Sequence, residues 1–229
     1  MFKKLFGKFS GEIHGEGPAV TREESTGQFT AIQIAGPFAL LWKQGQNCSW
    51  RAKMQENLFD YLETKVRGGT LEIGFTRSIS LADIEKRPTI EITSPSLDIL
   101  ELAGSVRAKD WDVVRGDKFS IKMAGSGRVD IALEMRRISI DKAGSGKVTL
   151  GGTANDIAIS CAGSGSISTL AIPAQNVSVS SAGSGTIEVS CSDKLDVSLV
   201  GSGSVHFAGN PTLNQNVIGS GKISQIRDN

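Results

Sequence analysis

The pattern of apolar and polar positions between Ala103 and Ile226 repeats seven times, at intervals of 18 to 21 residues. Each repeat carries a short glycine landmark, which is Ala-Gly-Ser in the first repeat and Gly-Ser-Gly in the other six. Apolar residues alternate with polar ones on both sides of the landmark, as is typical of half-buried strands. A fixed period near 20 residues indicates stacked supersecondary units. Each repeat therefore predicts a strand, a tight turn, a second strand and a less regular turn.

Two of the positions that precede the landmark are expected to face inward in the first strand, because each holds an apolar residue in six of the seven repeats. The position four residues before the first glycine holds Leu100, Ile121, Ile140, Ile159, Val179, Val197 and Gln215, and the position six before it holds Asp98, Phe119, Ile138, Ile157, Val177, Leu195 and Leu213. After the landmark, a second column should face outward. It consists of Asp130, Thr149, Ser168, Glu188, His206 and Ser224.

The glycines predict structural turns, because glycine accepts positive φ and lets the next coil approach closely. They are Gly125, Gly127, Gly144, Gly146, Gly163, Gly165, Gly183, Gly185, Gly201, Gly203, Gly219 and Gly221. Two strands and two turns in about 19 residues make one coil of a parallel β-helix, or β-solenoid, and the crossover rule favours a right-handed winding. The fold class is then all-β. A flat antiparallel meander joined by similar turns is the alternative.

The chain of 229 residues divides into three sections: a tail over 1–19, a degenerate β-rich section over 20–95, and the regular solenoid over 96–227. The middle section should cap the solenoid, whose end would otherwise expose an unpaired edge. We expect irregular structure over 11–28, strands at 38–42 and 48–54, a helical turn at 57–62, a hairpin over 63–75 and a loop over 77–86.

Near the start, Phe2, Leu5, Phe6 and Phe9 follow helical spacing among three lysines. They predict a short interfacial membrane anchor, with a frayed or packed tail as the alternative. The segment lacks the apolar core of a signal peptide. This favours a cytoplasmic protein or one held peripherally at the inner membrane.

Composition narrows the function classes. A net charge of +1 argues against a nucleic-acid partner, which needs a clustered basic surface. Cys48, Cys161 and Cys191 are odd in number and widely spaced, and are compatible with a reducing compartment.

No catalytic, cofactor or metal site is expected. His14 and His206 lie far apart in the pattern, and the outward column assembles no carboxylate pair for acid-base chemistry. Asp130 follows Gly127 at a spacing that loosely resembles calcium-binding repeats, but the other repeats do not keep an acid there.

Two groups of residues are candidates for binding. Ser126, Ser145, Ser164, Ser184, Ser202 and Ser220 should stack as a hydroxyl ladder, which either offers a regular polar surface or serves only the local turn. Trp42, Trp50 and Trp111 either form a binding or subunit-contact patch or pack in the core or cap.

Several motifs in a fixed order resemble a bacterial family, the auto-transporter adhesin head GIN domain (DUF2807). They are Phe29-Thr-Ala-Ile-Gln-Ile-Ala-Gly-Pro-Phe, Glu56-Asn-Leu-Phe-Asp-Tyr-Leu-Glu, Gly69-Thr-Leu-Glu-Ile, Thr93-Ser-Pro-Ser-Leu, the Gly-Ser-Gly series and Gly209-Asn-Pro. The resemblance covers about residues 20–226. It implies a β-helix-like superhelix, a role in adhesion without a known catalytic site, and a location at the cell surface.

Together these observations predict a non-enzymatic, adhesin-like or structural β-solenoid that acts through an extended repetitive surface. We expect a homo-oligomer with a glycan or protein ligand on one face. The alternative is a membrane-associated cytoplasmic scaffold that polymerises through the ends of the solenoid.

Overall fold

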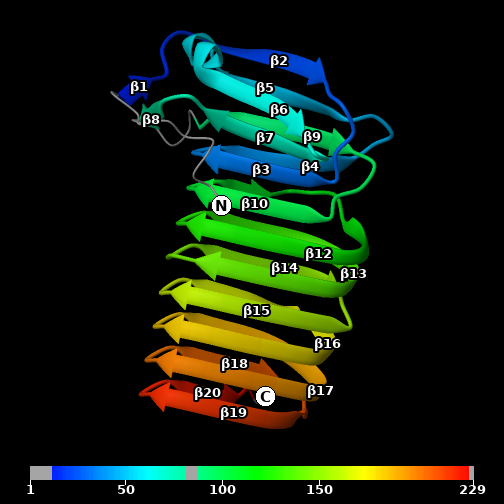
Figure 1. Cartoon of the computed structure of the whole chain (residues 1–229), viewed down its shortest axis with the longest axis vertical. Helices are drawn as coiled ribbons and strands as arrows, with labels where there is room; N and C mark the ends of the chain where they lie inside the picture. The colour runs from blue at the N-terminus through cyan, green and yellow to red at the C-terminus, as the bar shows by residue number, and fades with distance from the viewer. Residues whose placement is uncertain (1–11, 81–86, 227–229) are drawn as a thin grey trace.

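The computed structural model describes residues 12–80 and 87–226, and nearly all of them form strands stacked into a rod (Figure 1). The residues proposed as a membrane anchor, Phe2, Leu5, Phe6 and Phe9, lie outside the described residues. The described part contains one short helix, η2 (Glu56–Tyr61). No helix among these residues is long and apolar enough to cross a membrane.

The regular part is a parallel β-solenoid, so the antiparallel meander is excluded. Its strands are β10 (Ile99–Gly104), β11 (Arg107–Lys109), β12 (Val114–Gly125), β13 (Arg128–Ala143), β14 (Lys147–Thr153), β15 (Asp156–Gly163), β16 (Ser166–Gly183), β17 (Thr186–Gly201), β18 (Ser204–Ala208), β19 (Thr212–Gly219) and β20 (Lys222–Gln225). Every pairing among them is parallel. In Figure 1 the strands nearest the viewer run toward the Gly-Ser-Gly corner while the chain descends, which is the expected right-handed winding.

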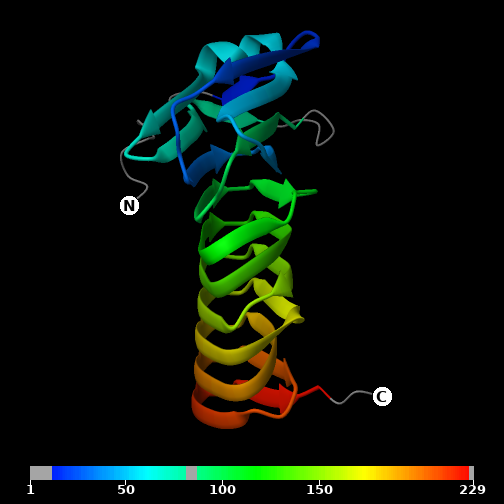
Figure 2. The same ribbon diagram turned by 90° about the vertical axis from the view of Figure 1, so that its right-hand side faces the viewer.

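The second corner has the expected break between β11 and β12, β14 and β15, and β18 and β19, but three other coils differ from the expectation. Instead of a separate turn, β13, β16 and β17 continue around it as single strands of 16, 18 and 16 residues (Figure 2). Register shifts between Thr169 and Pro173 mark where the ladder bends. Hydrogen bonding to the neighbouring coils thus persists through the corner, and bulges supply the curvature that a turn would otherwise give.

The core is the continuous interior of the coils. Ile121, Ile140 and Ile159 occupy one inward column and are at most 3% exposed. The interior also contains a lysine that the apolar pattern does not reveal. Lys142 is 3% exposed, and its Nζ donates a hydrogen bond to the carbonyl oxygen of Gly144 at 3.0 Å. This hydrogen bond offsets part of the cost of burying the amine, and the same carbonyl also accepts from the backbone N–H of Gly165 at 3.3 Å.

The section before the solenoid begins in register with it. β3 (Ala31–Gly36) pairs in parallel with β10, and β4 (Ala39–Gln44) pairs in parallel with β11. On their other sides, β7 (Thr70–Phe75) lies against β3 and β9 (Thr89–Ser94) lies against β4, again in parallel. The degenerate first repeat at 29–36 is therefore a true coil of the solenoid.

Antiparallel strands then close this end. β6 (Leu62–Arg67) pairs with β7, β5 (Ser49–Gln55) pairs with β9, and β2 (Ala19–Ser25) covers β5. The expected hairpin and helical turn are confirmed. Two segments expected to be irregular instead contain strands, since β1 (Glu12–His14) pairs with β8 (Ser78–Ser80) and β2 joins the cap. Their short, polar sequences carry no apolar alternation, so only tertiary pairing makes them strands.

Candidate binding groove

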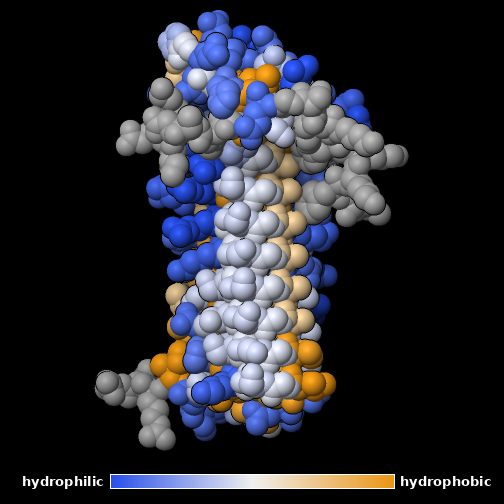
Figure 3. All heavy atoms as spheres, turned by 90° about the vertical axis from the view of Figure 1, so that its left-hand side faces the viewer, coloured by the Kyte–Doolittle hydropathy of each residue, from blue (hydrophilic) through white to orange (hydrophobic). Residues whose placement is uncertain are grey.

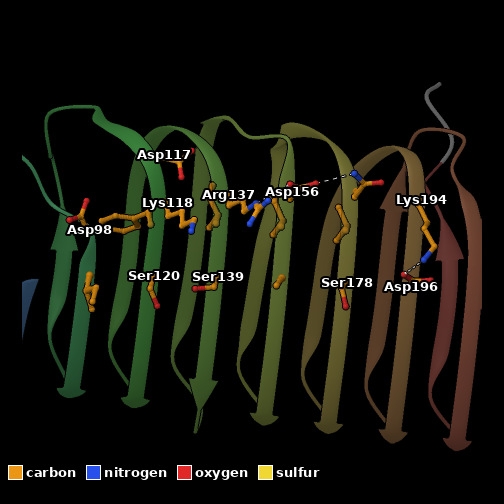
Figure 4. A pocket seen from close by; sticks show the side chains of 17 residues that line it. Asp98, Asp117, Lys118, Ser120, Arg137, Ser139, Asp156, Ser178, Lys194 and Asp196 are labelled. Atoms are coloured by element: carbon orange, nitrogen blue, oxygen red, sulfur yellow. Dashed lines mark hydrogen bonds and ion pairs between the residues drawn. The ribbon is translucent and has the colours of Figure 1, made fainter.

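An open groove of about 770 Å³ runs along one outer face of the solenoid, across β12, β13, β15, β16 and β17 (Figure 4). It crosses successive coils rather than following one strand. Each coil therefore adds an equivalent segment to its walls. The sequence reasoning did not identify this groove.

The groove arises from two outward columns of different size. Seven residues before the first glycine, long polar side chains stand in register: Lys118, Arg137, Asp156, Asn176 and Lys194. Five residues before it the side chains are mostly small: Ser120, Ser139, Ala158, Ser178 and Asp196. The residues between the columns, such as Ile138 and Val177, point into the core. A tall column beside a short one leaves a trough, and this size alternation is the sequence signal that could have found it.

Ion pairs and hydrogen bonds join several neighbouring side chains of the groove. Arg137 lies 3.5 Å from Asp156, and Asn176 donates a hydrogen bond to Asp156 at 2.9 Å. Further along, Lys194 pairs with Asp196 at 2.7 Å. The groove as a whole is lined by three cations and four carboxylates, which are Lys118, Arg137, Lys194, Asp98, Asp117, Asp156 and Asp196. It therefore mixes donors and acceptors with little net charge, which suits hydrogen bonding to a neutral polar ligand.

Two carboxylates of the groove, Asp117 and Asp196, are poorly suited to act as general acids. A hydrogen bond from Arg136 holds the pKa of Asp117 below its ordinary value, and hydrogen bonds from Lys194 and Asn214 lower the pKa of Asp196. A general acid at neutral pH needs the opposite shift. The geometry supports binding better than proton transfer.

The Gly-Ser-Gly corners form the edge of this face. The first glycine of each has positive φ at Gly125, Gly144, Gly163, Gly183, Gly201 and Gly219. The second glycine, such as Gly146, is needed for a different reason, because a Cβ there would lie 2.7 Å from the carbonyl oxygen of Gly127. The same close approach holds at Gly127, Gly165, Gly185, Gly203 and Gly221.

The serines between the glycines form an exposed column, which appears as a pale stripe along the rod in Figure 3. Ser220 and Ser202 lie within 3.2 Å of each other through their hydroxyl groups. Beside them runs a column of alanines, including Ala143, Ala162 and Ala182. The corner is thus a narrow ridge of hydroxyl and methyl groups.

Of the two interpretations of the tryptophans, their burial supports packing in the core and cap over a contact patch. Trp42 and Trp50 are only 1% and 6% exposed, and the indole nitrogen of Trp42 donates to Ser94 Oγ at 2.9 Å. Trp111 is half-buried beside Trp42, with ring centroids 6.2 Å apart, and donates to the carbonyl oxygen of Leu40. Trp42 and Trp50 thus belong to the core, and Trp111 packs against its edge.

The outward column from Asp130 to Ser224 is in register as expected. His206 in this column contacts Ser224 through Nδ1 at 2.8 Å. Within residues 12–80 and 87–226, no three His, Cys, Asp or Glu side chains gather in a way that could hold a metal ion. Cys48, Cys161 and Cys191 are buried and free.

Comparison with known proteins places the chain in a family. The model described as "Putative auto-transporter adhesin, head GIN domain" (DUF2807) matches residues 28–211. The structure is similar to that of a "putative adhesin" from Bacteroides fragilis NCTC 9343, with a TM-score of 0.82 and 26% identity over 93% of this chain and 100% of that chain. A comparison with curated proteins found no match.

Two structures from Parabacteroides distasonis ATCC 8503 share the fold. One is called a "putative adhesin", with a TM-score of 0.75 and 20% identity over 94% of this chain and 100% of that chain. The other is called a "putative lipid binding protein", with a TM-score of 0.75 and 23% identity over 95% of this chain and 100% of that chain. The stacked coils, the glycine corners and the family match agree. This chain belongs to the auto-transporter adhesin head GIN domain family.

Proposed function

We propose that this protein is a non-enzymatic, adhesin-like β-solenoid that binds an extended polar ligand, a glycan or a protein segment, along its outer face at a cell surface. The observation that supports this most is the groove that crosses five neighbouring strands with equivalent walls in each coil. A polymer laid along the solenoid axis repeats its contacts from coil to coil, so weak individual contacts add up. The family description, which names adhesion, supports the same reading.

Filling the floor of the groove tests this proposal. The double substitution Ser139→Trp and Ser178→Trp places two large rings on the floor, whereas the control Ser202→Trp places one on the exposed corner. Capture of the purified proteins on surfaces coated with mucin, collagen or neutral glycans is measured. The groove variant should lose most of the capture that the wild type shows on one of these surfaces, and the control should keep it. Equal capture by all three proteins would reject the groove as the binding surface.

Self-association is a second candidate activity, supported by the last coil. The exposed large apolar side chains of the described residues are Val200, Val217, Ile218 and Ile226, at 46%, 38%, 61% and 36% exposure. They gather at the lower end of the rod, where Figure 3 shows hydrophobic side chains at the surface. Among the described strands, β19 pairs only with β17 and β20 only with β18. We propose that a second copy covers this end, giving the expected homo-oligomer.

Light scattering after size exclusion tests the assembly at several protein concentrations. The wild type should form a dimer, and Val217→Lys with Ile218→Lys should shift it to the monomer, because charges then meet across the contact. Thr21→Lys on β2, at the opposite end, is the control and should leave the dimer intact. Growth to large species would favour the end-to-end scaffold, and a monomeric wild type would reject both assemblies.

A further inference from the structure

A column of three cations stands on the face opposite the groove, and its charges are not paired. Arg107 on β11, Arg128 on β13 and Lys147 on β14 occupy the same register position in successive strands, directly after the glycine corner. All three are exposed. Neighbouring strands lie about 4.8 Å apart, so like charges here face each other closely, which disfavours folding. We call these three residues the cationic column.

Most other cations of the solenoid have an acidic partner. Arg115 pairs with Glu134 and Lys122 pairs with Glu101, both at 2.8 Å. No ion pair joins the cationic column to an acid within the described part of the chain. The nearby described carboxylates are Asp130, two residues after Arg128, and Asp110, which pairs with Lys109 at 3.0 Å. The surface therefore keeps a positive excess.

A pocket of about 250 Å³ lies at the head of the column, lined by Arg87, Arg107, Lys109 and Asp110 together with residues of β4 and β9. Arg87 is held in place by donating from Nη1 to the carbonyl oxygen of Ser105 at 2.8 Å. Its Nε is buried and has no hydrogen-bond partner among the described residues. Burial and the charge of Arg107 lower the pKa of Arg87. An anion in this pocket would accept a hydrogen bond from Arg87 Nε and would reduce the repulsion between Arg87 and Arg107.

Below Lys147 the same register position continues with hydroxyl side chains. Ser166, Thr186 and Ser204 follow in successive strands, and Ser204 lies 3.4 Å from Thr186 through their hydroxyl oxygens. One line of surface thus presents three cations, then three hydroxyl side chains, and ends at Lys222 on β20. A single phosphate or sulfate is too small to contact three strands, whereas a linear polymer spans them.

We propose that the cationic column and its pocket bind a linear acidic polysaccharide laid along the solenoid axis. Its carboxylate or sulfate groups would meet Arg107, Arg128 and Lys147, and its sugar hydroxyls would meet the serine and threonine positions below. The line contains no aromatic side chain on which a base could stack, which disfavours single-stranded nucleic acid. This site is separate from the groove, so the proposal for the cationic column can hold whether or not the groove binds a ligand.

Titration calorimetry with a heparin-derived decasaccharide, at several salt concentrations, tests the proposal. Arg128→Gln with Lys147→Gln should weaken binding by about tenfold or more. It should also reduce the slope of log affinity against log salt concentration by about two, because two charged contacts are lost. The control Lys65→Gln with Arg67→Gln removes the same charge from β6 and should stay within about twofold of the wild type. Thermal unfolding confirms that both variants fold.

Three comparison ligands decide the partner class. Neutral dextran should not bind, and phosphatidylglycerol vesicles and a DNA oligonucleotide of matched charge should bind more weakly than the decasaccharide. The proposal is overturned if the wild type does not bind the decasaccharide, if the control loses as much affinity as the column variant, or if vesicles or DNA bind more tightly. Binding that survives Ser139→Trp with Ser178→Trp would show that it does not use the groove.

Discussion

At the scale of the residue, the two glycines of each Gly-Ser-Gly corner are required for different structural reasons. Gly144 has a φ of +108°, and a Cβ there would lie 2.5 Å from the carbonyl oxygen of Gly125 in the previous coil. Gly146 has no positive φ and is required only because the coils approach closely. The Ser between them is free of both demands, since it points to solvent.

Gly144→Ala should therefore destabilise the protein by about 2–4 kcal/mol, because backbone strain and a backbone clash act together. Gly27→Ala is the matched control, since its φ is ordinary and its nearest neighbour, Val66 Cγ1, lies 4.0 Å from an added Cβ. Denaturant unfolding of the three proteins measures both effects. Equal stability of the two variants would contradict the stacking argument.

The ion pair between Asp117 and Arg136 gives a pH dependence with a definite sign. The hydrogen bond from Arg136 lowers the pKa of Asp117 in the folded protein. The pair therefore stabilises the fold above the unfolded pKa of about 3.9, and this contribution is lost as the pH falls through the lowered folded value.

Asp117→Asn should lower the melting temperature slightly at pH about 7, and the difference from the wild type should vanish at pH about 2. The effect is small because both side chains are about half exposed to solvent. Melting curves at the two pH values measure it. A difference of the same size at both would show that packing, not ionisation, is responsible.

At the scale of the element, the surface of the solenoid is determined by columns of side chains that cross the strands. Parallel pairing places equivalent positions of successive coils next to each other, so the side chains at one position of the repeat form a continuous column along the rod. In the groove wall some neighbours have opposite charges, as in Arg137 beside Asp156. In the cationic column they do not, and Arg128 stands between Arg107 and Lys147.

Arg128→Gln should raise the free energy of unfolding by a few tenths of a kcal/mol at low salt, because it removes repulsion from both neighbours. Arg115→Gln on β12 is the comparison, since it breaks the ion pair with Glu134 on β13. It should lower the stability or leave it unchanged. Chemical unfolding at low and high salt measures both. Destabilisation by Arg128→Gln at low salt would mean that the arginine serves the fold.

At the scale of the whole molecule, the two ends of the solenoid differ. The edge strand β2 at the capped end carries Arg22, Glu23 and Glu24, and charges on an edge oppose pairing with another chain. The strand β19 at the other end has no charged residue. We therefore expect a discrete dimer rather than a filament, because the charges on β2 oppose pairing at the capped end.

Deleting 145–163 should leave a folded protein with a lower melting temperature, since it removes one whole coil and keeps every column in register. Deleting 145–153 should prevent folding of the solenoid, because the odd shift turns inward side chains outward. Circular dichroism and thermal melting distinguish the two. A folded product of the second deletion would contradict the coil-by-coil architecture.

The apolar alternation and the glycine spacing were sufficient to predict the solenoid, its inward columns and the outward column from Asp130 to Ser224. The family was predicted separately, from a resemblance carried by several motifs in a fixed order. Each coil repeats the same local interactions, so a pattern within about 19 residues already specifies the stacking. The hairpin at 62–75 was equally predictable, because Gly68 and Gly69 join two strand-like runs.

Only the tertiary structure decided the features that depend on neighbours from other coils or from the cap. Trp42 and Trp50 are core because cap strands cover them, and Lys142 lies inside, where its amine donates a hydrogen bond to the carbonyl oxygen of Gly144. The groove and the cationic column arise when residues about 19 positions apart stand side by side. The sequence determined the coil, and the stacking of coils decided which side chains became surfaces.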